Sequence, residues 1–436
     1  MTGESATVDG VAAWEVLDSR GDPTVRVRVT AGDATGTFTV PSGASTGAHE
    51  AVERRDGGDR YGGRGVREAV RAVRAELAPV VRGRDVTDQT GVDAALEDRD
   101  GRDDLSRLGA NAVLGVSGAV AHAAAEAVGE PLYRYLADGL LDDGRGSPGA
   151  LPLPMVNVFS GGLHARGGIE IQDFLVVPVG AGTYPAAVET AWAVRAAARE
   201  RVLERGQRPL VADEGGFAPG VDTVDGAFEL LLASVGDAGF EPGEDVAFAV
   251  DVAATHFHED GTYVLGSLDR RFDRAGMVDL VARWVEEYPL VSVEDPLAED
   301  DWTGWERLAD RVGDRVQLLG DDLVATDRQR LARGVEAGAA NGLIVKPNQA
   351  GTLTRTLRVV ETARSAGWAP VVSARSGETC DATVADLAVA RDAGQIKIGS
   401  LARSERLAKY NRLFGIANDP SHEGGFAGAD ALARWE

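Results

Sequence analysis

Two of the three lysines in this chain follow short apolar runs, and this placement makes them candidate catalytic groups. Nearly all of the 45 basic residues are arginine. Lys346 ends GLIVK and Lys397 ends QIK, whereas Lys409 is interpreted as a cation on a solvated face. Arginine keeps its proton at any working pH, but a lysine that is desolvated among like charges can lose its proton and act as a base. Lys346 and Lys397 are therefore candidates for positions that arginine cannot fill.

Acidic residues end three further apolar runs. Asp251, Glu294 and Asp321 follow VAFAV, LVSV and QLLG. Each one alone is better explained as a helix N-cap or a surface ion pair. If the three runs are strands that end at one edge, however, their carboxylates repel one another unless a hard cation neutralises them, and oxygen ligands suit Mg²⁺. Three carboxylates in register, followed by two lysines, predict a magnesium site.

Glu214, in the motif DEGG, adds an acid to this set. Mg²⁺ and Lys397 would lower the pKa of Lys346 and make it a base, while Glu214 could protonate a leaving hydroxyl. A base on one side, an acid on the other and a metal between them suit abstraction of a proton alpha to a carboxylate, followed by loss of a beta hydroxyl.

Two segments are candidates for phosphate binding. Arg375 and Ser376, in ARSGET, offer a planar fork of N–H donors and a hydroxyl. The loop at residues 41–47, PSGASTG, is rich in small residues and by itself predicts only a hairpin turn. Beside an active site it could close over a phosphate. We therefore expect a small phosphorylated hydroxy acid as the substrate.

The elements that must position these residues fall into two parts. Alternating residues over 24–30 and 35–40 predict an antiparallel hairpin, and the patterns over 65–81 and 109–129 predict helices. Residues 142–154 are rich in glycine and proline, which indicates a domain boundary. We therefore predict an N-terminal domain over residues 1–141 and a second domain over 142–436.

In the second domain, short apolar runs that end in a polar residue alternate with amphipathic helices about every 25 residues, which is typical of a (β/α) barrel. A doubly wound open sheet is the alternative, but no glycine-rich dinucleotide motif follows a first strand. Catalytic groups of a barrel lie at the carboxyl ends of its strands. The residues expected there are Glu214, Asp251, Glu294, Asp321, Lys346, Arg375 and Lys397.

Composition excludes several classes of protein. The 436 residues suffice for two domains or for one large barrel with an appendage, and 44% hydrophobic with 26% charged residues predicts a folded chain. A net charge of -24 argues against nucleic acid and anionic membranes as partners. The single cysteine, Cys380, fits a reducing cytoplasm. The N-terminus lacks the features of a signal peptide, and no apolar run approaches the ~18 residues that would span a bilayer. We expect a cytoplasmic location.

The chain resembles the enolase (phosphopyruvate hydratase) family almost from end to end. The motifs that carry the resemblance are LDSRGDPTV, PSGASTG, GANAVLGVS, DEGGFAP, VSVEDP, LLGDDL, KPNQAGTLT, RSGET, ATVADLAV, GQIKIGS and AKYN. The resemblance implies an N-terminal α+β capping domain and an enolase-type (β/α)8 barrel whose second strand is antiparallel. It also implies a Mg²⁺-dependent hydro-lyase that forms a homodimer or a higher homo-oligomer.

The resemblance further implies a role for each matching residue. Lys346 is then the base and Glu214 the acid. Two Mg²⁺ ions are implied for each active site, the second arriving with the substrate. The other implied roles are first-metal ligands for Asp251, Glu294 and Asp321, a second-metal and phosphate contact for Ser45, a phosphate clamp for Arg375 and Ser376, a carboxylate anchor for Lys397, and a substrate-binding histidine on a moving loop for His164.

Four positions depart from the family pattern near the substrate. Ala374 replaces the histidine of SHRSGET, Asp173 replaces the glutamate of QEF in a substrate-binding position, and Leu163 and Arg166 replace mostly polar or acidic residues. The hypothesis that we favour from the sequence is a paralogue of phosphonate biosynthesis with a wider pocket. It would convert a bulkier analogue such as carboxyphosphonoglycerate to carboxyphosphonoenolpyruvate.

Two alternatives remain open. Neutral drift in an ordinary enolase that converts 2-phosphoglycerate to phosphoenolpyruvate would also produce these departures. A non-catalytic binding or scaffold protein with the same fold is the other alternative. Loss of Lys346 or of a metal ligand would favour it, and none of them is lost.

Overall fold

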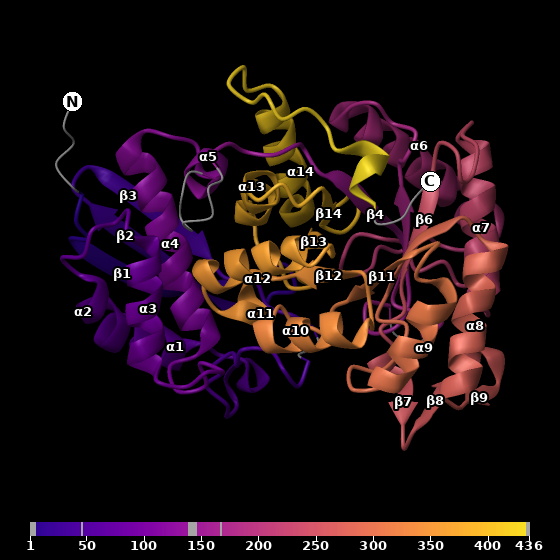
Figure 1. Ribbon diagram of the computed structural model, residues 1–436, viewed down its shortest axis with the longest axis horizontal. Helices are drawn as coiled ribbons and strands as arrows, with labels where there is room; N and C mark the ends of the chain where they lie inside the picture. The colour runs from indigo at the N-terminus through magenta and orange to yellow at the C-terminus, as the bar shows by residue number, and fades with distance from the viewer. Residues whose placement is uncertain (1–5, 45–46, 138–145, 166–167, 433–436) are drawn as a thin grey trace.

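The computed structural model describes residues 6–44, 47–137, 146–165 and 168–432. The N-terminal part contains a three-stranded sheet of order β1-β2-β3 (Figure 1). The predicted hairpin is confirmed, because β2 and β3 pair antiparallel from Arg26 opposite Thr39 to Ala31 opposite Ala34. The strands are β1 (Gly10–Leu17), β2 (Pro23–Ala31) and β3 (Ala34–Thr39).

Helix α4 packs across β2 and β3 and confirms the helix predicted over residues 109–129. Small residues permit the close approach, since a Cβ on Gly118 would lie 2.5 Å from the Phe38 ring. The helix predicted over residues 65–81 is two short helices joined by a π-helical turn. The helices of this part are α1 (Arg67–Ala72), η2 (Val73–Leu77), α2 (Ala78–Val81), α3 (Gln89–Asp100), α4 (Ala110–Val128) and α5 (Leu132–Ala137).

The second part is a closed barrel, so the (β/α) barrel prediction is confirmed and the open-sheet alternative is wrong. In the part of the chain that the structure describes, eight strands follow the order β10-β11-β12-β13-β14-β4-β5-β6. β5 is antiparallel to β4 and β6, as the family resemblance implies, and the other pairs are parallel. The strands are β4 (Leu153–Ser160), β5 (Asp173–Val177), β6 (Ala247–Asp251), β10 (Leu290–Glu294), β11 (Gln317–Gly320), β12 (Gly342–Val345), β13 (Ala369–Ser373) and β14 (Gln395–Lys397).

The prediction that Glu214 ends a barrel strand is wrong. Residues 205–223 connect α6 (Tyr184–Glu204) to α7 (Val224–Asp237), and Val211 forms only an isolated bridge with Phe217. The reason is the direction of β5, which returns the chain to the amino-terminal end of the barrel. Helix α6 then carries the chain to the opposite end, and α7 brings it back before β6 starts. The loop with Glu214 therefore reaches the mouth of the barrel without a strand of its own.

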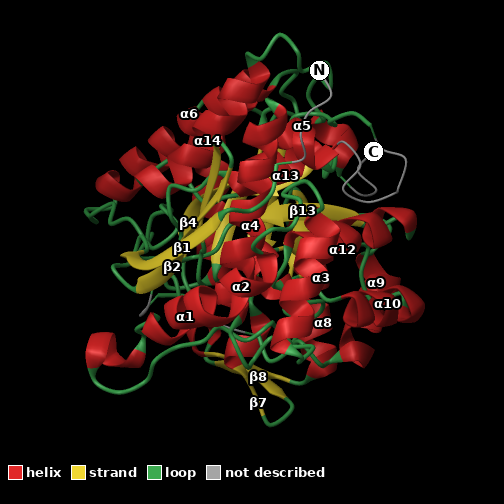
Figure 2. Cartoon of the chain, turned by 90° about the vertical axis from the view of Figure 1, so that its left-hand side faces the viewer, coloured by secondary structure: helices red, strands yellow, loops and turns green. Residues whose placement is uncertain are grey.

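The remaining helices surround the barrel, and a small antiparallel sheet of β7, β8 and β9 projects from its lower edge (Figures 1 and 2). None of the described helices is both long and apolar enough to cross a membrane. The remaining elements are β7 (His258–Glu259), β8 (Thr262–Leu265), β9 (Arg270–Phe272), α8 (Arg274–Glu287), α9 (Trp302–Val312), α10 (Arg328–Ala337), α11 (Pro347–Ala350), α12 (Leu353–Ser365), α13 (Thr383–Ala390), α14 (Ser404–Ala417) and the 3-10 turns Arg60–Gly63, Ala254–Phe257, Gly266–Leu268 and Gly428–Ala431.

The two parts pack against each other on the side of α11, α12 and α13. Buried polar contacts join them: Asp93 Oδ2 accepts a hydrogen bond from the Thr354 N–H (2.9 Å), and Ser117 Oγ accepts one from the Leu353 N–H (3.0 Å). The boundary predicted between residues 141 and 142 lies outside the described residues and stays a prediction.

Candidate active site

The carboxyl ends of the barrel strands bring most of the predicted residues together. Asp251, Glu294 and Lys397 are the last residues of β6, β10 and β14, while Asp321 and Lys346 directly follow β11 and β12. β6, β10, β11 and β12 are consecutive neighbours around the barrel. The positions of these five residues agree with those expected from the sequence, because parallel strands all end at the same rim.

The two lysines form ion pairs with the three acidic residues. Lys397 Nζ donates to Asp251 Oδ2 (2.7 Å) and to Glu294 Oε2 (2.6 Å), and Lys346 Nζ pairs with Asp321 Oδ2. All five groups are buried or nearly so. Glu294 Oε1 is buried and has no hydrogen-bond partner among the described residues.

These ion pairs affect the pKa of Lys346. Burial lowers the pKa of its ammonium, and the charges of Arg375 and Lys397 lower it further. The carboxylates of Asp321 and Glu294 together more than offset these effects, so the pKa of Lys346 lies above its usual value. The expected lowering of this pKa by Mg²⁺ and Lys397 stays a prediction, because in this arrangement Asp321 contacts Lys346 directly. Lys346 can act as a base only when Asp321 is engaged elsewhere.

A divalent cation fits the three strand-end carboxylates. They offer buried oxygen donors, and Glu294 Oε1 lacks a partner among the described residues. Burial, together with the charge of Asp251, raises the pKa of Glu294 well above its usual value, which a bound cation would relieve. A divalent ion there would take the place of the lysine ammonium groups.

Among the described residues, two groups have candidate ligand atoms within 4.8 Å of one another: His164, Asp173 and Glu214, and a trio of carboxylates, Asp295, Asp321 and Asp322. Asp295 is already engaged, because its Oδ1 and Oδ2 accept the backbone N–H groups of Asp321 and Asp322 (2.9 Å each). Burial raises the pKa of Asp322 to about 7. Asp295 is thus better suited to hold the loop of Asp321 than to bind a metal.

The candidate phosphate clamp is held against the N-terminal part. Arg375 donates to both carboxylate oxygens of Glu50 (3.0 and 3.2 Å) and to Asn348 Oδ1 (2.8 Å). Ser376 Oγ accepts a hydrogen bond from the Ala44 N–H (2.6 Å). The loop of the N-terminal part therefore lies directly on the loop after β13, although Ser45 itself is outside the described residues.

Helix α14 holds the same loop from the other side. Arg406 donates to the carbonyls of Arg375 and Ser376 (2.7 Å each). Lys409 is completely buried, donates to the carbonyls of Thr379 (2.8 Å) and Asp381 (2.7 Å), and pairs with a carboxylate of the same loop, Glu378. The interpretation of Lys409 as a solvated cation is therefore wrong, because its ammonium replaces water with carbonyls of a loop distant in sequence.

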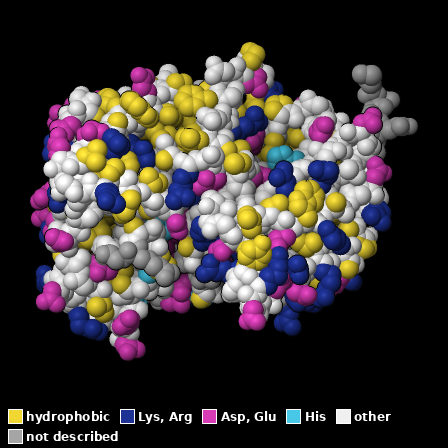
Figure 3. Space-filling view, turned by 180° about the vertical axis from the view of Figure 1, so that it is seen from behind, with side chains coloured by type: hydrophobic (Ala, Val, Ile, Leu, Met, Phe, Trp, Pro, Cys, Tyr) yellow, Lys and Arg dark blue, Asp and Glu magenta, His cyan; other side chains and the backbone are white. Residues whose placement is uncertain are grey.

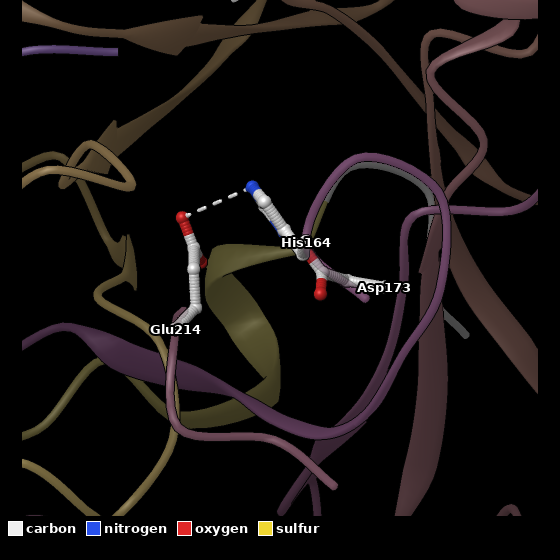
Figure 4. Close-up of side chains that lie close together, drawn as sticks. All are labelled: His164, Asp173 and Glu214. Atoms are coloured by element: carbon white, nitrogen blue, oxygen red, sulfur yellow. Dashed lines mark hydrogen bonds and ion pairs between the residues drawn. The ribbon is translucent and has the colours of Figure 1, made fainter. Parts of the chain in front are cut away.

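His164 lies between two carboxylates (Figure 4). Its Nδ1 is 2.9 Å from Asp173 Oδ2, and its Nε2 is 3.8 Å from Glu214 Oε1. Burial lowers the pKa of His164, but Asp173 and Glu214 raise it to about 9. Burial raises the pKa of Glu214, but the charges of His164 and Arg406 bring it below the usual value. In this arrangement Glu214 is ionised, so it must gain a proton before it can act as an acid.

The departures from the family pattern have different environments. The Ala374 side chain lines a cavity of about 40 Å³ at the barrel mouth, together with Lys346, Lys397 and Ser376, so the wider pocket expected there is not present in this arrangement. Leu163 lies at an outer opening beside Arg403. Asp173 is completely buried and is not part of the cavity lining. Arg166 lies outside the described residues.

Several residues at this cavity were not predicted. Gln172 donates to Asp251 Oδ2 (3.2 Å), and Gln349 donates to Asp321 Oδ1 (3.0 Å). His256 also lines the cavity. Gln349 and Gln172 lie within three residues of predicted site residues, and this proximity could have identified them. His256 had no comparable signal.

Comparisons with known proteins agree with this architecture. A family model described as "Enolase, N-terminal domain" matches residues 8–136, and one described as "Enolase, C-terminal TIM barrel domain" matches residues 148–434. A protein named Enolase from Acidothermus cellulolyticus is 49% identical over 437 residues, which cover 99% of this chain and 98% of that protein.

Proposed function

Because this chain belongs to the enolase family, and is thus a hydro-lyase, we propose that it converts 2-phosphoglycerate to phosphoenolpyruvate with Mg²⁺. The observation that carries the proposal is the set of two lysines and three carboxylates at the mouth of the barrel. The family acts on a small phosphorylated substrate, and the relative named Enolase matches this chain over nearly its whole length.

The ordinary reaction replaces the specialised one that the sequence favoured. The full-length similarity to a protein named Enolase supports it, and neither the comparisons nor the small cavity beside Ala374 supports a bulkier substrate. In this proposal Ala374, Asp173 and Leu163 are variations within a working enolase. Conversion of the bulkier analogue is kept as an outcome of the test.

The residues would act as follows. Asp251, Glu294 and Asp321 hold Mg²⁺, and Ser45 contributes to a second ion, while Arg375 and Ser376 hold the phosphate. Mg²⁺ would stabilise the negative charge that develops on the substrate carboxylate. Lys397, released from Asp251 and Glu294, donates to that carboxylate.

The proton transfers fall to two residues. Lys346, released from Asp321, accepts the alpha proton at Nζ. Glu214 donates a proton to the leaving beta hydroxyl, which departs as water. The charge of a phosphorylated substrate nearby favours protonation of Glu214.

We also propose a cytoplasmic homodimer, for which the family resemblance is the support, and light scattering on the purified protein would test the dimer.

The test is turnover by the purified full-length protein. We expect conversion of 2-phosphoglycerate that is abolished by EDTA and restored by Mg²⁺. Carboxyphosphonoglycerate is measured in parallel. Preference for that analogue would overturn the proposal in favour of the specialised enzyme, and no turnover of either compound would overturn it in favour of a non-catalytic protein.

A further inference from the structure

Asp173 has both of its carboxylate oxygens engaged within the protein. Oδ1 accepts hydrogen bonds from Asn157 Nδ2 (2.5 Å) and Ser160 Oγ (2.9 Å). Oδ2 lies 2.9 Å from His164 Nδ1. The side chain is completely buried and does not line the cavity. Both carboxylate oxygens of Asp173 are therefore occupied by protein groups and do not face a substrate.

The supporting residues lie on the rigid part of the fold. Asn157 and Ser160 belong to β4, and Asp173 begins β5 directly opposite Ser160 in the antiparallel ladder. A Cβ on Gly216 would lie 2.6 Å from Asn157 Oδ1 and 2.8 Å from Ser160 Oγ, so the loop that carries the acid packs tightly on this group. The sheet thereby fixes Asp173, whereas His164 lies on the loop that connects the two strands.

We propose that Asp173, held by Asn157 and Ser160, is a positioning residue that acts through His164 and does not itself touch the substrate. A carboxylate that accepts the Nδ1–H of a histidine sets the ring orientation and the nitrogen that faces the site. Here it directs His164 Nε2 toward Glu214 (Figure 4). This proposal extends the proposed function. Its kinetic test depends on that function being correct, whereas its NMR test does not.

The first measurement needs no substrate. The protein contains six histidines, so ¹⁵N labelling of histidine gives a spectrum in which His164→Gln identifies the His164 signals. We expect Ser160→Ala to shift the His164 Nδ1 signal, because the hydroxyl no longer holds Asp173 Oδ1. Ser234→Ala is the matched control, since Ser234 is equally buried and donates only to the Leu230 carbonyl within α7 (2.6 Å).

The second measurement is kinetic. We expect Ser160→Ala to lower kcat about 10-fold with KM within twofold, in line with other residues that orient a functional histidine through a hydrogen bond. Asp173→Asn, which keeps the size but not the charge, should lower kcat further, and Ser234→Ala should leave it unchanged. Thermal unfolding of each variant shows whether a lower kcat results from loss of the folded structure.

Two outcomes would overturn the proposal. One is a Ser160→Ala protein with wild-type His164 signals and wild-type kcat. The other is an Asp173→Glu protein that keeps both the His164 signals and kcat and changes only KM, which would assign Asp173 to substrate binding. If wild type has no turnover, the proposed function fails, whereas the His164 spectra still decide whether Asp173 and Ser160 position the imidazole.

Discussion

At the scale of single residues, the site is a set of charges that hold one another in a resting arrangement. Lys346 and Lys397 neutralise the carboxylates that we propose as metal ligands. This explains how the chain folds with three buried acidic residues at one rim, since a buried charge without a partner is costly. If Asp321 binds Mg²⁺ as proposed, the ion would weaken the pair between Asp321 and Lys346, so metal binding would help to release the base.

The roles of Lys346 and Glu214 can be separated by isotope exchange. Lys346→Ala should abolish exchange of the alpha hydrogen of 2-phosphoglycerate with D₂O, because no other proposed group accepts that proton. Glu214→Gln should stop dehydration but leave the exchange measurable by NMR. Exchange that persists in Lys346→Ala would assign the base to another residue.

The metal ligands can be separated from the neighbouring acidic trio. Glu294→Gln should weaken Mg²⁺ binding at least ~10-fold in calorimetry on EDTA-treated protein, because a neutral amide replaces a charged oxygen ligand. Asp322→Asn is the control and should bind Mg²⁺ nearly as wild type does. The opposite pattern would place the ion at Asp295, Asp321 and Asp322, whose oxygens lie within 4.8 Å of one another.

At the scale of elements, the N-terminal loop that contains Ser42 contacts the loop after β13, and helix α14 holds the latter in place. The backbones of Ser42 and Gly377 exchange hydrogen bonds (2.8 and 2.9 Å), which ties the N-terminal loop to the loop after β13. Arg406 and Lys409 of α14 donate hydrogen bonds to carbonyls of the loop after β13. The position of Arg375 thus depends on a helix residue, Arg406, 31 residues further along the chain.

Lys409→Met tests this support. The change leaves the buried carboxylate of Glu378 without its partner, and such losses cost about 3–5 kcal/mol of the free energy of unfolding. We also expect KM for 2-phosphoglycerate to rise more than kcat falls, because the loop of Arg375 loses its anchor. Urea unfolding and steady-state kinetics measure the two effects.

Arg283→Met is the control for this prediction. Arg283 pairs with Asp225 between α8 and α7 while remaining partly exposed. Its loss should cost less than about 1 kcal/mol and leave KM unchanged. Equal effects of the two changes would show that Lys409 has no special relation to the phosphate loop.

At the scale of the whole molecule, the capping part and the barrel are joined by a buried polar contact in a strongly acidic chain. Figure 3 shows acidic and basic side chains interspersed over the face seen from behind. At the junction, by contrast, Asp93 is buried completely and receives hydrogen bonds but no countercharge among its nearest partners. Burial raises its pKa to about 6.

Asp93→Asn should therefore change the pH dependence of stability. Because the pKa of Asp93 is higher in the folded protein than in the unfolded chain, the folded wild type binds this proton more tightly. The proton therefore contributes to the free energy of unfolding. This contribution is complete below the unfolded pKa of about 4 and is lost as the pH rises through about 6. Relative to wild type, Asp93→Asn should gain stability between pH 5 and pH 7.5, by on the order of 1–2 kcal/mol. Gln89 Oε1, buried and without a partner among the described residues, can accept from the new amide.

Denaturant unfolding at the two pH values measures this difference, and titrations that the two proteins share cancel in it. Asp237→Asn is the control, because Arg201 lowers the pKa of that exposed carboxyl, so it stays ionised at both pH values and the change should not alter the pH dependence between them. Parallel stability curves for wild type and Asp93→Asn would show that Asp93 remains ionised in the folded protein.

The barrel and the residues at its rim could be predicted from local patterns in the sequence. Asp251, Glu294 and Lys346 each end an apolar run, and since parallel strands end on one side, local patterns were enough to bring them together. The hairpin and the long helix of the N-terminal part were predictable for the same reason, because period 2 and period 3.6 are local properties.

Features that depend on contacts between distant segments could not be predicted from the sequence and are seen only in the folded protein. Because β5 is antiparallel to its neighbours, Glu214 lies on a loop between two helices and not at the end of a strand as predicted. The burial of Lys409 depends on a loop 30 residues earlier in the chain, and the contact of Asp173 with His164 depends on how two strands and their connection close. Charge pairing and direction of strands are set by the closed barrel as a whole, and no single segment carries that information.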